Sequence, residues 1–407
     1  MKAEAIDGIE KFISPGKGRG LRVTRAVGLG ELLYACPAFA YVLSVGERGY
    51  RCEFCLTKKQ TLAKCGKCKK AFYCNVGCQV RHTHTHTHTH THTHTHTHTH
   101  WRGASEKLLL MSELEAHLDE MDNERRQVNE MDISALHHFY SKHLDFPDHT
   151  HLLSIFSQVN CNGFNIEDEE LTHLASAVYP DMALINHSCC PNVIVTYKGA
   201  VAEVRAVQEM KPGDEILTSY IDLLYPTDDR NERLRDAYYF TCCCPECSSR
   251  AKDKQKLKLR KLREAPPPEE VRDMLLYARK TIQEFRRVKE LLQMCELSLE
   301  RMGAVFEDSN VFMLHMMYQA MGVCLYQGDW EGAARYGDKI IRPFSALYPA
   351  YSMNVSSMYL KLGRLYMGLE KPVMGVTMFK KALSIMEVAM GTDHHSIAEL
   401  KREMQQK

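Results

Sequence analysis

The sequence has no apolar run long enough to cross a membrane. Its 407 residues contain no stretch of 18 or more consecutive apolar residues, whereas a membrane-spanning helix needs about 20. The first twenty residues also lack the apolar core of a secretory signal peptide. We therefore expect an intracellular protein that does not enter a membrane.

The sequence also has almost no net charge, because 52 Lys and Arg residues nearly balance 51 Asp and Glu residues. The formal charge of +1 at pH 7 excludes a global field that would draw the protein to nucleic acid or to a membrane surface. Direct DNA binding is therefore not expected. The hydrophobic fraction of 44% is ordinary for a soluble globular protein, and the length predicts two or three folded units.

Disulfide bonds are not expected, although the chain has 16 cysteines. An intracellular compartment keeps thiols reduced, and ten of the 16 fall into two close-spaced groups, which favours zinc. The groups are Cys52, Cys55, Cys65, Cys68, Cys74 and Cys78, then Cys242, Cys243, Cys244 and Cys247. Thiolates two residues apart can point at one tetrahedral ion. The six ligands of the first group exceed one site and fall short of two.

A pure alternation of histidine and threonine occupies residues 82–100. An uninterrupted CA dinucleotide repeat encodes such an alternation, so we interpret the segment as a microsatellite read through a wrong exon boundary. The functional alternative is a metal-binding histidine tract. The segment has no apolar residue to bury, so we expect it to pack poorly.

Strands are predicted in two parts of the chain. Residues 9–48 read as short strands and turns, with a tight glycine-rich turn at 15–20. Residues 152–222 have strand-like patterning again, and 193–207 read as a hairpin. These two parts predict a sheet-containing domain that is interrupted in the sequence.

Helices are predicted between and after these strands. Residues 105–145 have apolar residues at three- and four-residue steps, with Ser105 as the N-cap. The basic run 250–263 is expected to be a solvated linker or helix, and the pattern is helical from Glu269 to the end. In that last part Met321-Gly322 recurs as Leu362-Gly363, which predicts either tetratricopeptide-like paired helices or a plain antiparallel bundle.

Two short runs carry the chemistry. Residues 186–192 read Asn-His-Ser-Cys-Cys-Pro-Asn, and residues 213–220 read Gly-Asp-Glu-Ile-Leu-Thr-Ser-Tyr. With the cysteines at 242–247, they resemble the catalytic end of a SET domain, the fold that transfers methyl groups from S-adenosylmethionine to protein lysines. The first cysteine group resembles a MYND zinc finger. The whole order is similar to the SET-and-MYND family of lysine methyltransferases over nearly the entire chain.

This resemblance implies an α+β fold. A split SET domain of β-clip sheets would carry an inserted MYND finger and a helical insert, followed by a post-SET zinc site and a C-terminal α-helical, tetratricopeptide-like domain. The implied parts are 1–50 (first part of the SET domain), 51–100 (finger, ending in the His-Thr repeat), 101–159 (helical insert), 160–225 (SET core), 226–250 (post-SET region), 251–268 (basic linker) and 269–407 (helical domain).

The resemblance also implies the residues of the methyl-transfer site. The reaction needs a neutral amine, a narrow channel and a cofactor pocket, and burial lowers the pKa of an amine. The hydroxyl of Tyr220 would meet the reacting amine, Tyr238 would close the channel, and Phe164 would form its wall. The implied contacts of S-adenosylmethionine are Lys17, Gly18, Arg19, His117, Asn162, Asn186, His187, Tyr238, Tyr239 and Phe240.

The family pattern implies three zinc sites. The first would be held by Cys52, Cys55, Cys74 and Cys78. The second would be held by Cys65 and Cys68 with His86 and His90, which stand where the family has a histidine and a cysteine. The third would be held by Cys189, Cys242, Cys244 and Cys247, leaving the adjacent Cys190 and Cys243 out.

The family further implies partners and location. We expect histone and non-histone protein substrates, a role in transcription, proline-rich peptides at the finger, chaperones or regulators at the helical domain, a monomer, and presence in cytoplasm and nucleus. The chain departs from the family at residues 79–104, which replace a longer stretch. The alternative function is therefore an adaptor with an impaired catalytic core. The lysines of the finger are expected to form a solvated face rather than phosphate contacts.

Overall fold

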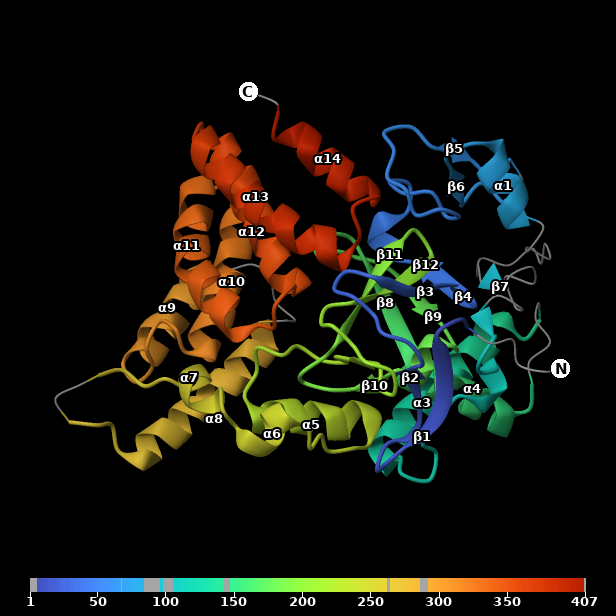
Figure 1. The fold of residues 1–407 in the computed structure, drawn as a ribbon, viewed down its shortest axis with the longest axis horizontal. Helices are drawn as coiled ribbons and strands as arrows, with labels where there is room; N and C mark the ends of the chain where they lie inside the picture. Colours follow the sequence, from blue (N-terminus) through green and yellow to red (C-terminus); the bar gives the residue numbers. More distant parts are fainter. Residues whose placement is uncertain are drawn as a thin grey trace. The chain divides into compact units, whose positions relative to one another are not determined.

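The computed structural model describes most of the chain, which forms two compact units (Figure 1). The described residues are 6–66, 68–83, 96–97, 105–142, 147–261, 264–285 and 292–405. The first unit comprises Met1–His187, Pro191–Thr218 and Asp236–Tyr239, and the second comprises Ser188–Cys190, Ser219–Arg235 and Phe240–Lys407.

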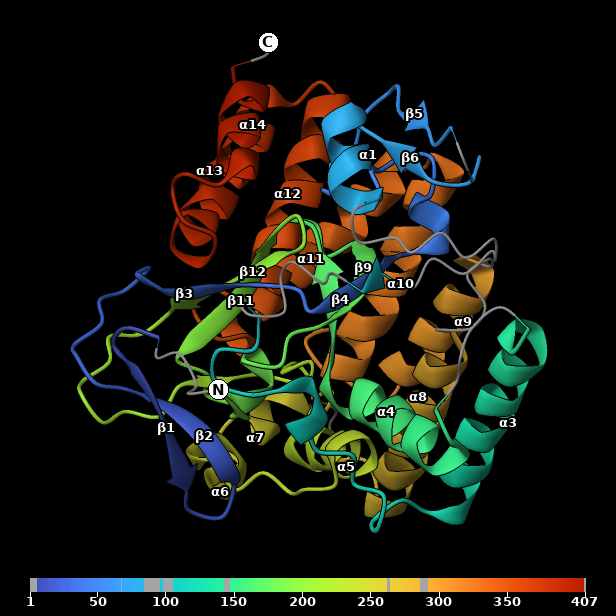
Figure 2. The same cartoon turned by 90° about the vertical axis from the view of Figure 1, so that its right-hand side faces the viewer.

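The first unit is built from small sheets. The hairpin β1 (Ile9–Ser14) and β2 (Gly18–Val23) encloses the predicted tight turn, where the Lys17 amide donates to the Ser14 carbonyl over 3.1 Å. A second sheet has the order β11-β12-β3, and a third has the order β7-β4-β9-β8 (Figure 2). Their strands are β3 (Leu32–Pro37), β4 (Ala40–Leu43), β7 (His96–Thr97), β8 (Gly163–Glu167), β9 (His173–Val178), β11 (Val193–Lys198) and β12 (Val201–Ala206).

The predicted hairpin at 193–207 is confirmed. Antiparallel pairing runs from Val193 opposite Ala206 to Lys198 opposite Val201. The turn between the strands contains Gly199, at a φ of 60°, which glycine adopts without strain. The predicted strands around residues 32–45 are also present as β3 and β4.

The prediction of a helix that starts at Ser105 is wrong for residues 106–122. Ser105 itself is helical, but residues 106–122 contain only the short 3-10 helix η2 (Met111–Glu113), and the α-helix α3 (Asn123–Tyr140) begins at the Asp122 cap. The buried carboxylate of Asp181 accepts the backbone amides of Lys107, Leu108 and Leu109 at 2.7 to 3.0 Å. Because these amides are bound to a side chain far away in sequence, the segment stays extended, and its leucines join the core of the first unit.

The strand-like prediction is wrong for residues 152–162, which belong to helix α4 (His149–Asn162). Asp148 caps this helix by accepting the His151 amide over 3.0 Å. Leu153, Ser157 and Gln158 form its buried face, and the Gln158 amide donates to the Leu114 carbonyl over 2.9 Å. The first strand in this part of the chain is therefore β8, which begins at Gly163.

The finger is a small body within the first unit. It contains η1 (Val45–Glu47), the strand pair β5 (Ala63–Lys64) and β6 (Phe72–Tyr73), and helix α1 (Val76–Thr83). Ala71 and Tyr73 are buried among its cysteines. Of the predicted His-Thr repeat, only residues 82–83 and 96–97 lie within the described part of the chain.

The second unit is helical, as predicted from Glu269 onward. Its helices are α5 (Thr227–Tyr238, whose last turn belongs to the first unit), α6 (Pro245–Ser249), α7 (Asp253–Lys256), α8 (Pro268–Phe285), α9 (Leu292–Gly303), α10 (Val311–Gln327), α11 (Trp330–Leu347), α12 (Met353–Gly368), α13 (Pro372–Ala389) and α14 (His395–Glu403). None of the helices among the described residues has the length and apolarity that a membrane crossing requires.

The C-terminal helices pack in sequence order, α10 on α11, α11 on α12 and α12 on α13 (Figure 1). Helix α10 is central, because it buries residues around most of its circumference. Two glycines admit close neighbours: a Cβ on Gly337 would lie 2.6 Å from Leu362, and one on Gly363 would lie 2.4 Å from Phe379. The two copies of the sequence repeat lie on α10 and α12, the first helices of two successive pairs, which favours the paired-helix interpretation.

Candidate functional site

Four predicted zinc ligands come together in the second unit. The sulfur atoms of Cys189, Cys242, Cys244 and Cys247 all lie within 4.8 Å of one another. Cys189 follows β10 (Asn186–His187), whereas the other three follow α5, and the Cys242 amide donates to Asn231 Oδ1 of α5 over 2.8 Å. Four thiol groups without a competing oxygen ligand are the donor set of a structural zinc site.

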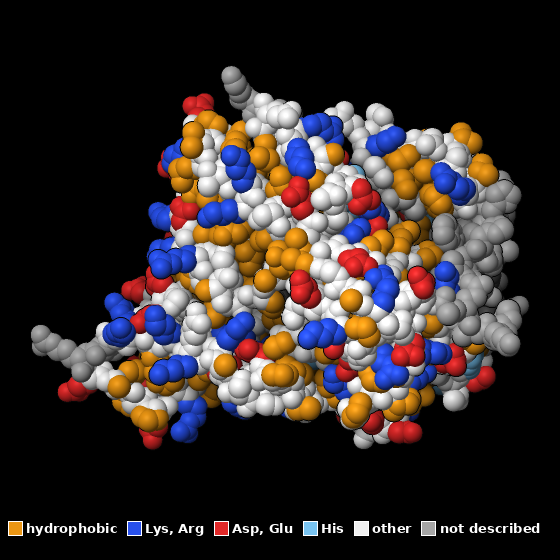
Figure 3. Space-filling model, viewed as in Figure 1, with side chains coloured by type: hydrophobic (Ala, Val, Ile, Leu, Met, Phe, Trp, Pro, Cys, Tyr) orange, Lys and Arg blue, Asp and Glu red, His pale blue; other side chains and the backbone are white. Residues whose placement is uncertain are grey.

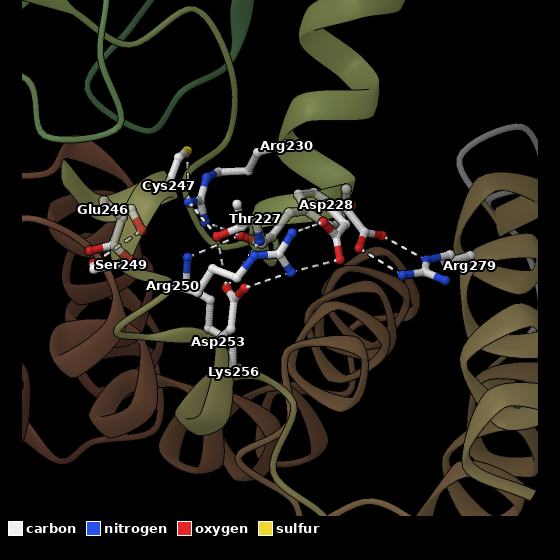
Figure 4. Close-up of polar contacts among 12 residues, drawn as sticks. Thr227, Asp228, Arg230, Glu246, Cys247, Ser249, Arg250, Asp253, Lys256 and Arg279 are labelled. Atoms are coloured by element: carbon white, nitrogen blue, oxygen red, sulfur yellow. Dashed lines mark hydrogen bonds and ion pairs between the residues drawn. The ribbon is translucent and has the colours of Figure 1, made fainter. Parts of the chain in front are cut away.

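A buried arginine supports this assignment. Arg230 of α5 is 0% exposed, and its Nε lies 3.2 Å from Cys189 Sγ while its Nη2 lies 3.4 Å from Cys247 Sγ (Figure 4). A buried guanidinium needs anionic or carbonyl partners, and zinc thiolates supply negative charge. Sequence reasoning missed Arg230, because nothing distinguishes it from Arg233 and Arg235 of the same helix.

The finger contains a second group of four. Cys52, Cys55, Cys74 and Cys78 have their sulfur atoms within 4.8 Å of one another, which is the interleaved set that the family pattern implies. Cys65 and Cys68 pack into the finger core but join neither group of three or more ligands found among the described residues. Their expected partners His86 and His90 lie outside the described residues.

His82, the first residue of the repeat, has a structural contact. It is 0% exposed, and its Nδ1 lies 2.5 Å from the Tyr73 hydroxyl. The repeat therefore begins inside the packed finger rather than after it. Neither of the two thiol groups includes this histidine.

Several predicted cofactor contacts meet at the start of β2. The Asn186 side-chain amide donates to the Arg19 carbonyl over 3.1 Å and to Glu215 over 2.9 Å, and Lys17 pairs with the same Glu215 over 3.0 Å. Gly20 permits this approach, because a Cβ there would lie 2.8 Å from the Asn186 amide nitrogen. Gly18, at a φ of 77°, has no neighbour within 4 Å of where its Cβ would be. The backbone at Gly18 is thus held in place beside open space, as a cofactor-contacting turn requires.

The extended segment after η2 is associated with three more of the predicted residues: Asn162, His117 and Tyr239. Arg19 pairs with Glu115 over 2.7 Å, and the Asn162 side chain donates to the Glu115 carbonyl over 2.8 Å. His117 stacks on Tyr239, with ring centroids 4.9 Å apart and planes 27° apart. Both of these residues have positive φ, 49° and 60°, a conformation rare for non-glycine residues and often found at functional sites.

Sequence reasoning missed the residues that hold these contacts in place. Glu115 and Glu215 each anchor two of the predicted positions. Arg125 of α3 donates to the Tyr239 hydroxyl over 3.0 Å and to the Asp236 carbonyl. Glu215 belongs to the Gly-Asp-Glu run, so its place in that motif was an available signal; Glu115 and Arg125 carry no motif.

The predicted channel residues fall into two sets. In the first unit, the ring of Phe164 on β8 packs edge-on against the buried ring of Tyr179, with centroids 5.6 Å apart. Tyr238 lies in the same unit, and its burial raises the pKa of its hydroxyl, with a smaller contribution from Cys161. In the second unit, the rings of Tyr220 and Phe240 pack edge-on at 6.3 Å and 88°. His187 is buried on β10, which pairs in parallel with β13 (Leu217–Thr218).

Comparison with known proteins follows this geometry. The family model of the SET domain matches residues 18–221. The N-lysine methyltransferases SMYD2 of Homo sapiens and Bos taurus are each 58% identical to this chain over 432 aligned positions, and SMYD2-A of Danio rerio is 56% identical over 434; each match covers 100% of both chains. The chain therefore belongs to the family of SET-domain proteins that includes the SMYD2 N-lysine methyltransferases.

The matches also bear on the length of the chain. The alignment with the human relative has 432 positions, 25 more than the 407 residues here, so the relatives contain residues that this chain lacks. The shortening at residues 79–104 stays a prediction. A solved Podosopora anserina kinesin light chain structure with TPR-like repeats covers 35% of this chain and 66% of its own, at 12% identity and a TM-score of 0.25, which is too low to establish a shared fold.

Proposed function

We infer that the chain is a protein-lysine N-methyltransferase that uses S-adenosylmethionine. The observation that carries this conclusion is the full-length match at 58% identity to proteins named N-lysine methyltransferase, together with the SET region at 18–221. The adaptor alternative is not favoured, because the relatives that match over the full length are named as N-lysine methyltransferases. Protein substrates follow from this activity.

S-adenosylmethionine, when bound, supplies an electrophilic methyl group on a sulfonium. The chain has to hold an unprotonated lysine amine in line with that group. We assign this role to Tyr220, whose hydroxyl would accept or donate a hydrogen bond at the amine, with Phe240 fixing its ring by edge-on contact. Tyr238 and Phe164 would form the aromatic lining, which lowers the pKa of an inserted amine by excluding water and favours methylammonium by contact with ring faces.

We assign cofactor binding to the connected set in the first unit. Asn186 fixes the Arg19 carbonyl, and so orients the Lys17-Gly18-Arg19 backbone toward the open space beside Gly18. The stacked rings of His117 and Tyr239 present an aromatic edge. Asn162 and His187 are assigned to the same set, and Phe240, which belongs to the second unit, keeps its predicted role as a cofactor contact. The thiol groups at 189–247 and 52–78 would hold zinc as structural ions, with four sulfur ligands each and no open position for catalysis.

We extend this proposal to partners and location from the family resemblance. The substrates would be histone and non-histone proteins, with effects on transcription; the finger would bind proline-rich peptides, and the helical domain chaperones or regulators. The protein would act as a monomer in cytoplasm and nucleus. Lys and Arg side chains alternate with Asp and Glu over the face in Figure 3, which supports protein rather than nucleic-acid partners.

The test uses radiolabelled S-adenosylmethionine with histones or with cell extract. We expect labelled protein from the unchanged chain, and a loss of about 100-fold or more in Tyr220→Phe, since a positioned proton-transfer or hydrogen-bonding group contributes about that much. Tyr326→Phe, at a side chain that is 85% exposed, is the matched control and should label normally. If the unchanged chain labels protein no more than Tyr220→Phe does, the assignment of methyltransferase activity is refuted.

A further inference from the structure

Two buried cations lie behind the segment that follows Tyr220. Arg230 is 0% exposed and Lys256 of α7 is 2% exposed. Most lysines and arginines are exposed, so a pair of buried cations calls for a purpose. Both side chains donate to the same backbone oxygen, the carbonyl of Tyr225: Arg230 Nη1 over 2.7 Å and Lys256 Nζ over 2.9 Å.

Arg230 connects the thiol group to this segment. One edge of its guanidinium faces two sulfur atoms, Cys189 Sγ at 3.2 Å and Cys247 Sγ at 3.4 Å. The other edge faces two oxygen atoms, the Tyr225 carbonyl at 2.7 Å and the Thr227 hydroxyl at 3.1 Å. The planar fork of arginine can serve such a set of acceptors at once, whereas a lysine ammonium is a single point charge. Figure 4 shows the side chain lying between Cys247 and Thr227.

Helix α7 holds the same segment from the other side. Lys256 donates also to the Leu223 carbonyl over 2.8 Å, and Asp253 accepts from both the amide and the hydroxyl of Thr227 at 3.0 Å. Burial lowers the pKa of Lys256 to about 8, with a further contribution from Arg230. The segment 223–227, which begins three residues after Tyr220, is thus clamped between two cations and one carboxylate.

The charge of a filled metal site would stabilise this arrangement. Four thiolates on one Zn²⁺ would carry a net charge of −2, and hydrogen bonds from a protein to zinc-bound thiolates tune metal retention. Without those thiolates the guanidinium would be buried with only two neutral acceptors, which is costly. Occupancy of the metal site and the position of residues 223–227 should therefore be coupled through Arg230.

We propose that Arg230 is a positioning residue for methyl transfer, which carries the state of the zinc thiolates at Cys189 and Cys247 to residues 223–227, the segment that follows Tyr220. The proposal rests on the methyltransferase function given above. Lys256 supports the same segment but makes no hydrogen bond to a ligand sulfur in the described structure. The two residues should therefore differ in their effects on metal and agree in their effect on catalysis.

The experiment compares Arg230→Lys and Lys256→Met with Arg250→Lys in the full chain. Arg250 is the matched control, because it pairs with Asp228 at the exposed side of α5, over 2.5 and 3.0 Å (Figure 4). Zinc release into a chromogenic chelator, kcat, and the Kd for S-adenosylmethionine are measured for each. We expect Arg230→Lys to release zinc about 10- to 100-fold faster and to lower kcat by about tenfold or more, with the cofactor Kd unchanged. Lys256→Met should lower kcat with zinc release unchanged.

Three outcomes would overturn the proposal. If Arg230→Lys releases zinc at the same rate as Arg250→Lys, Arg230 does not act on the metal site. A kcat for Arg230→Lys equal to that of the control would remove the link to catalysis. If Arg230→Lys does not fold, an unchanged kcat in Lys256→Met would refute the clamp. An inactive unchanged chain would instead count against the methyltransferase function, and the zinc-release comparison would still be informative.

Discussion

The two cysteine groups differ in how the chain assembles and supports them. In the finger, the four ligands lie within 27 consecutive residues, and Cys55 and Cys74 are part-exposed. In the second unit, Cys189 and Cys247 are 58 positions apart, and three of the four ligands are buried. A locally assembled site stabilises mainly its own loop, whereas a site assembled from distant segments ties together parts of the fold that must be aligned for function.

The arginines beside the two groups show the same contrast. Arg230 is fully buried and donates to ligand sulfurs. Arg51, at the start of the finger, pairs instead with Glu47 over 2.7 Å and Asp168 over 3.3 Å, and donates to the Leu56 carbonyl over 3.2 Å. Arg51 therefore anchors the finger to the neighbouring loops, while Arg230 acts on the metal site.

The largest expected difference comes from removing one ligand of each group. Cys247→Ser should abolish methyl transfer and lower the free energy of unfolding by about 3 to 5 kcal/mol, because it removes a metal ligand and one of the two sulfur partners of a buried guanidinium. Cys55→Ser should leave methyl transfer close to that of the unchanged chain. Thermal unfolding and labelled methyl transfer check the pair, and equal losses in the two variants would break the comparison.

The next prediction concerns the number of zinc ions that the two cysteine groups bind and the order in which they leave. The described residues contain two groups of four thiols, so we expect at least two zinc ions per chain in mass spectrometry under native conditions. The part-exposed finger ion should leave first when a chelator is added. Three ions would mean that the His-Thr repeat completes a site with Cys65 and Cys68.

The finger side should respond to pH. Burial raises the pKa of Glu167, next to the Asp168 that binds Arg51, from 4.5 to about 7, with Asp168 adding to the shift. The folded state therefore keeps a proton that the unfolded state releases, and stability falls as pH rises from about 4.5 through 7. Glu167→Gln should remove this dependence and stabilise the chain at pH 8 by on the order of 1 to 3 kcal/mol. Chemical unfolding at pH 5 and pH 8 measures the difference, and an equal effect at both values would contradict it.

The smallest effect is expected at the finger anchor. Arg51→Lys keeps the charge but loses the fork that reaches two carboxylates and a carbonyl, so we expect a loss of about 1 kcal/mol. Zinc release from the finger should not change, since Arg51 makes no hydrogen bond to a ligand sulfur among the described contacts. Faster release would show that both arginines act on their metal sites, and so would remove the contrast.

The sequence predicted those features that depend on local pattern. The hairpin at β11 and β12 follows from apolar alternation around a glycine turn, and the ligand sets follow from cysteine spacing and family resemblance. The segment 106–122 was not predictable in this way, because its leucines have helical spacing while the Asp181 carboxylate, more than 70 positions away, binds its amides. The strand prediction for residues 152–162 was wrong for a related reason. These residues form helix α4, whose buried face packs on the extended segment that contains Leu114.

The candidate site shows the same difference between residues that a local pattern predicts and residues that only the fold reveals. Motifs pointed to Asn186, Tyr220 and the cysteines, because the chemistry needs those residue types at those spacings. Two supporting residues, Glu115 beside Arg19 and Asn162 and Arg230 beside Cys189, are single charged residues within ordinary extended or helical sequence. Their importance comes from partners far away in sequence and, for Arg230, from burial, which only the folded structure shows.

The separation of Cys189 from the three later ligands implies an order of biosynthesis. The finger ligands at 52–78 are all present once the ribosome has made the first fifth of the chain, whereas the other set stays incomplete until Cys247 has been made. Domains usually fold in the order of synthesis. A nascent chain would thus hold its finger ion while Cys189 still waits as a free thiol, exposed to oxidation until α5 and Arg230 arrive.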